Sequence, residues 1–160
     1  MEIVIIAHNI RSVLNLGSIF RTAEGFGVRK IYLSGYTPNW HSNLPHVRQK
    51  MSKQIHKTAL GAEEIVVSEY VPDLIAKIAE QKKDGWRIVG LEQDARAILL
   101  PDYKPSGKIA LLLGEEVGGI ENQLRQLCDD LIEIPMRGQK ESFNVAVATG
   151  VALYDLTTRR

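Results

Sequence analysis

Two glycine-rich segments late in the chain constrain the fold more than any other feature. They are Ala110–Ile120 (ALLLGEEVGGI) and Ile134–Gly150 (IPMRGQKESFNVAVATG), which follow the last two strand-like runs. A dinucleotide-binding domain instead carries its glycine-rich phosphate loop between its first strand and first helix. Neither segment contains the Lys-Ser/Thr ending of a phosphate loop. We therefore expect an uncharged or zwitterionic ligand that is held by backbone groups rather than by its phosphates.

Short apolar runs alternate with helical patterns along the whole chain. Six runs predict strands: Ile3–Ala7, Lys30–Ser34, Ile65–Ser68, Trp86–Leu91, Ile109–Leu113 and Leu131–Ile134. Nearly continuous apolar strands that alternate with helices are typical of a parallel sheet buried on both faces. The predicted fold class is α/β, with a parallel sheet covered by helices on both faces. A chain of 160 residues has the size of one domain, so we expect a single domain over 1–160.

Three segments show the periodicity of helices. One buried face of the first helix is formed by Leu16, Ile19, Phe20, Ala23 and Phe26. Pro72 precedes a second helix, 73–83, whose inward residues are expected to be Leu74, Ile75, Ile78 and Ala79. The last helix, 143–158, contains Gly150, and a glycine inside a helix costs about 1 kcal/mol relative to alanine. Gly150 therefore predicts a tight contact with another helix or a ligand.

The charges are unevenly distributed, although the net charge is only +1. Residues 1–60 contain eight Lys or Arg, two acids and all four histidines, whereas residues 61–160 are net acidic. This asymmetry favours a nucleic-acid partner over a chance clustering of solvated charges.

Other classes of protein are disfavoured. The single cysteine, Cys128, excludes an internal disulfide, fits a reducing compartment and is expected to pack as a small hydrophobic residue. No apolar run is long enough for a signal peptide or a membrane span, so we expect a cytoplasmic protein. The histidines share no i, i+4 spacing and have no cysteine pair near them, so we expect no metal site.

Three motifs resemble those of the SpoU/TrmH-type RNA ribose 2′-O-methyltransferases, a branch of the SPOUT superfamily. The first, N-x-G-x-x-x-R-T, reads NLGSIFRT at 15–22, and the second, G-x-E-x-x-G, reads GEEVGG at 114–119. The third reads IPM at 134–136 and SFNV at 142–145, with Phe143 where leucine is commoner. They follow the first, fifth and sixth predicted strands, so the resemblance spans almost the whole chain.

The resemblance implies an α/β fold whose C-terminal segment forms a deep trefoil knot. It also implies a homodimer with active sites at its interface, S-adenosylmethionine as methyl donor, and an RNA ribose as acceptor. We expect neither an appended N-terminal RNA-binding domain nor a long C-terminal extension, and we therefore expect tRNA rather than rRNA as the substrate.

The resemblance assigns residues to the donor site and to catalysis. An apolar slot with close backbone approach for the donor is expected from Leu113, Gly114, Gly118, Ile134, Met136, Gly138, Ser142 and Phe143. Without the resemblance, these residues would be assigned to ordinary turns beside core strands. The matching catalytic positions are Arg21, Asn15, Glu116, Ser142 and Asn144.

In the family, the arginine that matches Arg21 lies at the ribose and is proposed to activate its 2′-hydroxyl. A guanidinium is effectively always protonated, so we expect Arg21 to orient the hydroxyl and stabilise the developing alkoxide rather than act as a base. Asn15 is expected to cap the first helix. Glu116 is expected to hold Arg21 or Asn144 in place.

The RNA contacts implied by the basic segment are Arg11, Arg48, Lys50, Lys53 and Lys57, beside His46, with Tyr36 or Trp40 available to stack on an unpaired base. The alternative for these residues is a solvated basic helix. Alternative functions are a non-catalytic RNA-binding protein that retains the knotted fold, a flavodoxin-type small-molecule binder, and a methyltransferase that modifies bases.

Overall fold

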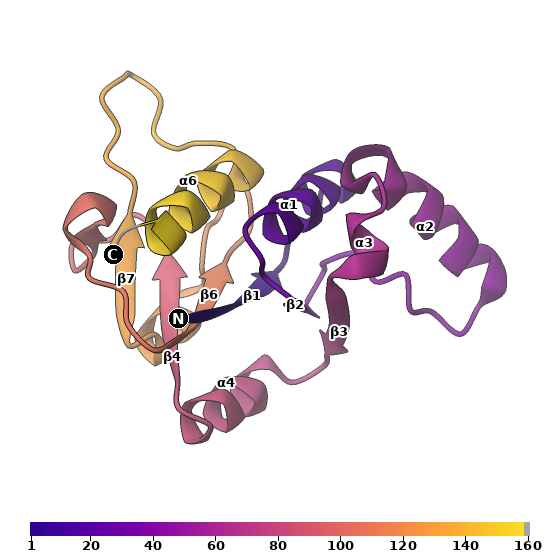
Figure 1. The fold of residues 1–160 in the computed structure, drawn as a ribbon, viewed down its shortest axis with the longest axis horizontal. Coiled ribbons are helices and arrows are strands. Elements are labelled where there is room, and N and C mark those ends of the chain that lie inside the picture. The colour runs from indigo at the N-terminus through magenta and orange to yellow at the C-terminus, as the bar shows by residue number, and fades with distance from the viewer. Residues whose placement is uncertain (159–160) are drawn as a thin grey trace.

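A seven-stranded parallel sheet lies at the centre of the protein (Figure 1). The computed structural model describes residues 1–158. The strands are β1 (Glu2–His8), β2 (Lys30–Ser34), β3 (Val67–Val71), β4 (Trp86–Leu91), β5 (Ile98–Leu99), β6 (Lys108–Leu113) and β7 (Asp130–Glu133). Their order is β3-β2-β1-β6-β4-β7-β5, and all the pairings between these strands are parallel. The predicted parallel α/β sheet is confirmed.

Helices cover both faces of the sheet. They are α1 (Val13–Gly25), α2 (Pro45–Ala59), α3 (Ala62–Ile65), α4 (Leu74–Lys83), α5 (Asn122–Leu127) and α6 (Val145–Thr158), with a short 3-10 turn at Leu100–Asp102. Alternate residues of β1 point to opposite faces, as a strand period of two requires. Ile5 and Ala7 pack in one core cluster with α1 and α6, whereas Val4 and Ile6 pack in another with α4 and α5.

Several element boundaries differ from the sequence-based prediction. Ile65 belongs to α3, so β3 begins at Val67 rather than at Ile65. Ile75 and Ala79 of α4 face solvent, contrary to prediction, because the buried face of the helix is narrow and consists of Leu74, Ile78 and Gln81. Gln81 Nε2 donates to the hydroxyl of Tyr32 over 3.3 Å, whereas Gln81 Oε1 is buried without a hydrogen-bond partner among the described residues.

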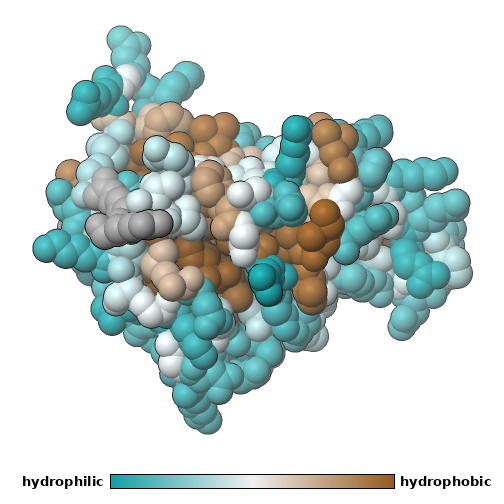
Figure 2. Space-filling model, viewed as in Figure 1, coloured by the Kyte–Doolittle hydropathy of each residue, from teal (hydrophilic) through white to brown (hydrophobic). Residues whose placement is uncertain are grey.

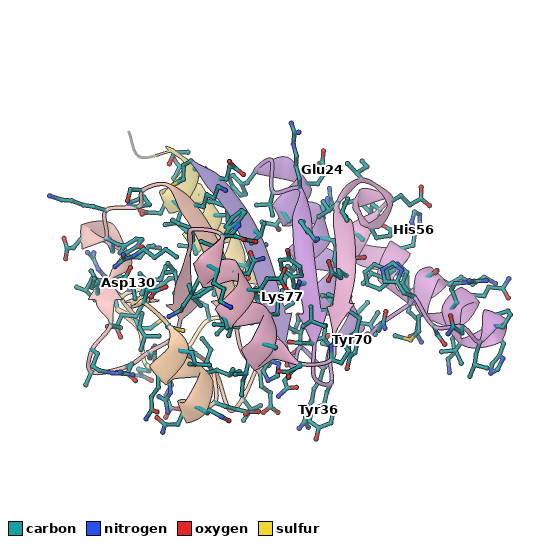
Figure 3. The ribbon with its side chains drawn as sticks, turned by 90° about the horizontal axis from the view of Figure 1, so that it is seen from below. Glu24, Tyr36, His56, Tyr70, Lys77 and Asp130 are labelled. Atoms are coloured by element: carbon teal, nitrogen blue, oxygen red, sulfur yellow. The ribbon has the colours of Figure 1, made fainter. Side chains whose placement is uncertain are left out.

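The loop between β2 and α2 brings one aromatic side chain into the core and leaves another in solvent. Trp40 is 8% exposed and packs edge-on against Phe20, with ring centroids 5.1 Å apart. Trp40 is therefore not available to stack on a base, and that expectation is wrong. Tyr36 is 75% exposed and extends from the edge of the molecule (Figure 3). Beyond this loop, α2 projects away from the sheet in both ribbon views (Figures 1 and 3).

One close contact fixes α2 against α1. A Cβ added to Gly17 would lie 2.0 Å from Thr58 Oγ1 and 2.7 Å from the carbonyl oxygen of Ile55. The two helices therefore cross where only glycine fits. Thr58 Oγ1 also donates to the carbonyl of Leu14 over 2.9 Å, so the C-terminal end of α2 is joined to the N-terminal end of α1.

Candidate active site

A cavity of about 230 Å³ lies between the loops that follow β6 and β7. β4 lies between these two strands in the sheet, and its own end completes the wall. Seven of the eight residues predicted to bind a donor line this cavity: Leu113, Gly114, Gly118, Ile134, Met136, Ser142 and Phe143. Gly138 does not line it, and an added Cβ there would meet nothing within 4 Å.

The glycines of the loop after β6 are required by the loop's own packing. A Cβ on Gly114 would lie 2.4 Å from the backbone of Gly119 and Ile120. Gly119 has a φ of +67°, and a Cβ there would lie 2.2 Å from a carboxylate oxygen of Glu92. Because the backbone folds back on itself at these positions, the loop presents a compact wall to the cavity.

Two residues at the end of β4 join the loops, and sequence reasoning missed both. Glu92 Oε2 accepts a hydrogen bond from the backbone N–H of Ile120 over 2.6 Å. Gln93 Nε2 donates to the carbonyl of Glu141 in the other loop over 2.5 Å. Their position directly after a strand is the sequence feature that could have identified them, because parallel α/β sheets bind ligands at the carboxyl ends of their strands.

The charged residues that line the cavity are all acidic: Glu92, Glu115, Glu116, Glu133 and Glu141. Within the described residues, its lining contains no Lys, Arg or His. A wall of carboxylates favours a ligand with positive charge and opposes one that presents phosphates.

Glu116 joins this loop to the beginning of α1. Its Oε1 accepts from the backbone N–H of Ser12 over 3.1 Å and from Asn15 Nδ2 over 3.3 Å, and its Oε2 accepts from the backbone N–H of Arg11 over 3.2 Å. Burial would raise the pKa of the Glu116 carboxyl, but the hydrogen bonds it accepts outweigh burial and lower its pKa. Glu116 is therefore an ionised acceptor rather than a proton donor at neutral pH.

Asn15 continues the connection to the third motif. Asn15 Oδ1 accepts from Asn144 Nδ2 over 3.1 Å, and Asn144 Oδ1 accepts from the backbone N–H of Ala146 over 2.9 Å at the start of α6. Residues from all three motifs thus form one chain of hydrogen bonds, Glu116–Asn15–Asn144. Glu116 reaches Asn144 through Asn15 and not directly.

The expectation that Asn15 caps the first helix is wrong. The N-cap of α1 is Ser12, whose side chain accepts from the backbone N–H of Asn15 over 3.1 Å. Asn15 lies inside the helix, where its side chain is free to bond Glu116 and Asn144. The hydroxyl of Ser142 forms no hydrogen bond with the residues that the structure describes, although Ser142 lines the cavity.

Two further carboxylates of the loop are held by the residues that follow β1. Glu115 pairs with Arg11 Nε over 3.1 Å. Glu121 accepts from Asn9 Nδ2 over 3.1 Å and lies 3.6 Å from His8 Nε2. Burial lowers the pKa of His8. Arg11, predicted to contact RNA, is thus already paired and lies over the ring of Tyr36, with 5.8 Å between the guanidinium carbon and the ring centroid.

Arg21 lies apart from this network. It is exposed on α1, and its side chain forms no hydrogen bond or ion pair with residues 1–158. Asn15 and Arg21 are about 120° apart around the helix axis at 3.6 residues per turn. Within one chain, Glu116 bonds to Asn15 and not to Arg21, so of its two expected partners it reaches Asn144, through Asn15.

Residues 1–158 contain neither a group of metal-ligating side chains nor a helix that could span a membrane. Among residues 1–158, no three His, Cys, Asp or Glu side chains are grouped as metal ligands would be. In the same part of the chain, no helix combines the length and apolar character needed to cross a bilayer.

Comparisons with known proteins agree with this arrangement. Residues 2–154 match the model of the SpoU rRNA Methylase family. The chain is 32% identical to the 23S rRNA (guanosine-2'-O-)-methyltransferase RlmB of Coxiella burnetii, over 99% of this chain and 59% of that protein. It is 28% identical to the tRNA (guanosine(18)-2'-O)-methyltransferase of Aquifex aeolicus, over 99% of this chain and 70% of that protein.

Solved structures share the fold. An rRNA methyltransferase from Sinorhizobium meliloti superposes with a TM-score of 0.82 at 25% identity, covering 97% of this chain and 55% of that one. The chain spans about three-fifths of the length of the RlmB relatives it matches. Because the family model covers nearly all of the sequence, this chain belongs to the SpoU rRNA Methylase family.

Proposed function

We propose that this chain transfers a methyl group from S-adenosylmethionine to a ribose 2′-hydroxyl of RNA. The observation that carries the proposal is the hydrogen-bonded chain Glu116–Asn15–Asn144, which brings the three motifs together beside the cavity. The activities in the names of the family relatives agree with this reaction.

The cavity suits S-adenosylmethionine by its charge and its surface. When bound, this donor supplies an electrophilic methyl group on a positively charged sulfonium. Five carboxylates and the absence of lining cations among the described residues favour such a charge. Leu113, Ile134, Met136 and Phe143 offer apolar surface for an adenine, and the compact loop 114–119 offers backbone groups. The residues therefore fit the donor.

Arg21 is proposed to act on the acceptor rather than on the donor. Its guanidinium stays protonated, so it orients the 2′-hydroxyl and stabilises the alkoxide that develops as the oxygen attacks the methyl carbon. Its exposure and its lack of a partner among residues 1–158 leave it free to bind substrate. Asn15, Glu116 and Asn144 hold the loops in register, and the free hydroxyl of Ser142 is available to a bound molecule.

We further propose that the active site is composite and forms in a homodimer. Leu14 on α1, and Val147, Val151 and Tyr154 at i, i+4, i+7 spacing on α6, are exposed apolar side chains. Hydrophobic residues gather on the face that carries both helices (Figure 2). Arg21 lies on the Leu14 side of α1, so a second copy packed on this face would bring its Arg21 toward the cavity of the first.

The C-terminal trefoil knot is part of the same proposal. The segment between β7 and α6 is tied to the end of β4 by the Gln93–Glu141 hydrogen bond, and α6 then packs on α1, in the core cluster of β1 and β6. A segment that leaves β7 and returns to the middle of the sheet is compatible with threading. We keep transfer RNA as the proposed substrate class, while the names of the relatives include both 23S rRNA and tRNA.

The test is transfer of labelled methyl from S-adenosylmethionine to unmodified tRNA and to 23S rRNA, in parallel. Methylation of the ribose produces dinucleotides that resist nuclease digestion, whereas methylation of a base does not. We expect label in resistant dinucleotides of the tRNA, and label confined to those of 23S rRNA would overturn tRNA as the substrate class while ribose methylation stands. Donor binding without transfer to either RNA would favour the non-catalytic alternative, and label in digestible nucleotides would mean base methylation.

A further inference from the structure

Helix α2 carries a stripe of one histidine and three lysines that no other helix of the described chain shows. His46, Lys50, Lys53 and Lys57 recur at intervals of four, three and four residues, which places them within about 60° around the helix axis. This stripe lies directly opposite Ile55 and Ala59, the buried residues of α2. The helix contains no Asp or Glu.

The stripe is left without acidic partners. Elsewhere, Lys30 pairs with Glu69, Lys77 with Glu69 and Glu80, and Lys82 with Asp129. Lys50, Lys53 and Lys57 are exposed and form no ion pair with residues 1–158. His56, on the flank of the stripe, is the α2 residue that bonds an acid, Glu63.

Helix stability does not explain this arrangement. The N-terminal end of a helix carries partial positive charge, which disfavours cations and favours acids. α2 nevertheless has no acid in its first turn, where the dipole would favour one, and carries Arg48 there. The dipole favours Lys57 in the last turn, but it does not account for the absence of acids at the N-terminal end.

The C-terminal end of the stripe lies next to the start of α1, which carries Asn15 of the candidate active site. Lys57 precedes Thr58, whose hydroxyl bonds the carbonyl of Leu14, the residue before Asn15. From this point α2 projects away from the body of the protein (Figures 1 and 3). Exposed Tyr36 extends from the loop between β2 and α2 (Figure 3).

From this geometry we propose that the outward face of α2 binds the phosphodiester backbone of a helical RNA segment next to the modified nucleotide. The inference rests on the proposed RNA substrate. Evenly spaced lysines on a rigid helix suit the repeating charges of a backbone and read no sequence. The surface therefore supplies affinity and positioning rather than the choice of nucleotide.

The experiment measures RNA affinity as a function of salt for the full chain. The test variant is K50S/K53S, and the matched control is K82S/K83S, which removes two exposed lysines from α4 on the opposite side of the sheet. The probes are the tRNA and 23S rRNA transcripts of the methyl-transfer assay. Each lost phosphate contact should lower the slope of log K against log salt by roughly 0.7 to 0.9.

We expect K50S/K53S to reduce the slope by roughly 1 to 2 and the affinity by on the order of tenfold, with unchanged affinity for S-adenosylmethionine. K82S/K83S should change neither. Equal slopes for the test and control variants would overturn the inference, as would lysine-dependent binding of polyglutamate or anionic vesicles as tight as that of RNA. If the wild type transfers methyl normally but K50S/K53S binds RNA like the wild type, the inference fails while the proposed function stands.

Discussion

Asn15 and Asn144 lie 129 positions apart in the chain, yet the side-chain amide of Asn144 donates to the side-chain oxygen of Asn15 over 3.1 Å. The side-chain oxygen of Asn144 accepts hydrogen bonds from the backbone N–H groups of Ala146 and Val147 in the first turn of α6. One side chain thus both begins the last helix and connects it to the first.

Replacing Asn144 with alanine is expected to destabilise the protein by about 1 to 2 kcal/mol, because the cap of α6 and the bond to Asn15 are both lost. Urea denaturation measures the change. Ser142→Ala is the control, since that hydroxyl has no hydrogen bond to residues 1–158. Equal losses of stability in the two variants would contradict the capping role of Asn144.

Replacing Arg21 with alanine should lower the rate of methyl transfer by roughly 100- to 1,000-fold, the usual effect of removing one stabilising donor from a developing oxyanion. Stability and S-adenosylmethionine affinity should stay within error, because Arg21 is exposed and lies away from the cavity lining. Arg29→Ala, which removes another exposed arginine, is the control for charge. An unchanged transfer rate in Arg21→Ala would remove Arg21 from the mechanism.

Two glycines of the helical layer should respond in opposite ways to alanine. Gly17→Ala is expected to cost roughly 1 to 3 kcal/mol, since its Cβ would meet the backbone of Ile55 at 2.7 Å and Thr58 Oγ1 at 2.0 Å. Gly150→Ala should be tolerated within one chain, because its nearest contact would be Thr22 Cγ2 at 3.5 Å. The measurement is urea denaturation of both variants.

Gly150→Ala also tests the proposed homodimer. If a second copy packs closely on α6, the added methyl group should weaken association even where the single chain accommodates it. Sedimentation equilibrium at micromolar concentrations, with wild type and Gly150→Ala side by side, measures this. A wild type that remains monomeric would count against the composite site.

The ionised state of Glu116 predicts a dependence of stability on pH. Because its folded pKa is lowered, its contribution is fully present above the ordinary glutamate value and is lost as pH falls through the lowered pKa. Glu116→Gln should therefore be less stable than wild type by about 1 to 2 kcal/mol at pH 7, and the difference should shrink below pH 4.5. Urea denaturation across this range is the measurement, and a difference that does not vary with pH would argue against an ionised acceptor.

The amino-acid sequence predicts the sheet well because its strands are almost continuously apolar, as in Ile109–Leu113. It also identifies the loops after β6 and β7, which line the cavity. Short elements such as α3 and β5 are not predictable, because four or two residues carry too little periodicity. Helical spacing predicts Ile75 in the core, whereas packing turns α4 so that Gln81 is buried instead.

The sequence predicts most of the residues that line the cavity, but it does not predict which side chains contact each other. Asn15 is a strong N-cap residue, yet Ser12 takes that position because the helix begins earlier than its apolar face. Glu92 and Gln93 belong to no motif, and only the position of β4 between β6 and β7 brings them to the cavity. The sequence predicts Trp40 as a surface on which an RNA base could stack, but in the fold Trp40 packs against Phe20.

The three acids Glu115, Glu116 and Glu121 on one loop all bond to residues 8–15 on another. Loss of any one acid leaves a donor in the first segment without its acceptor, so a lineage that changes one segment is under pressure to change the other. Paired substitutions between 8–15 and 115–121 should therefore accumulate together across genomes, and either segment moved alone into a related protein should disturb its cavity.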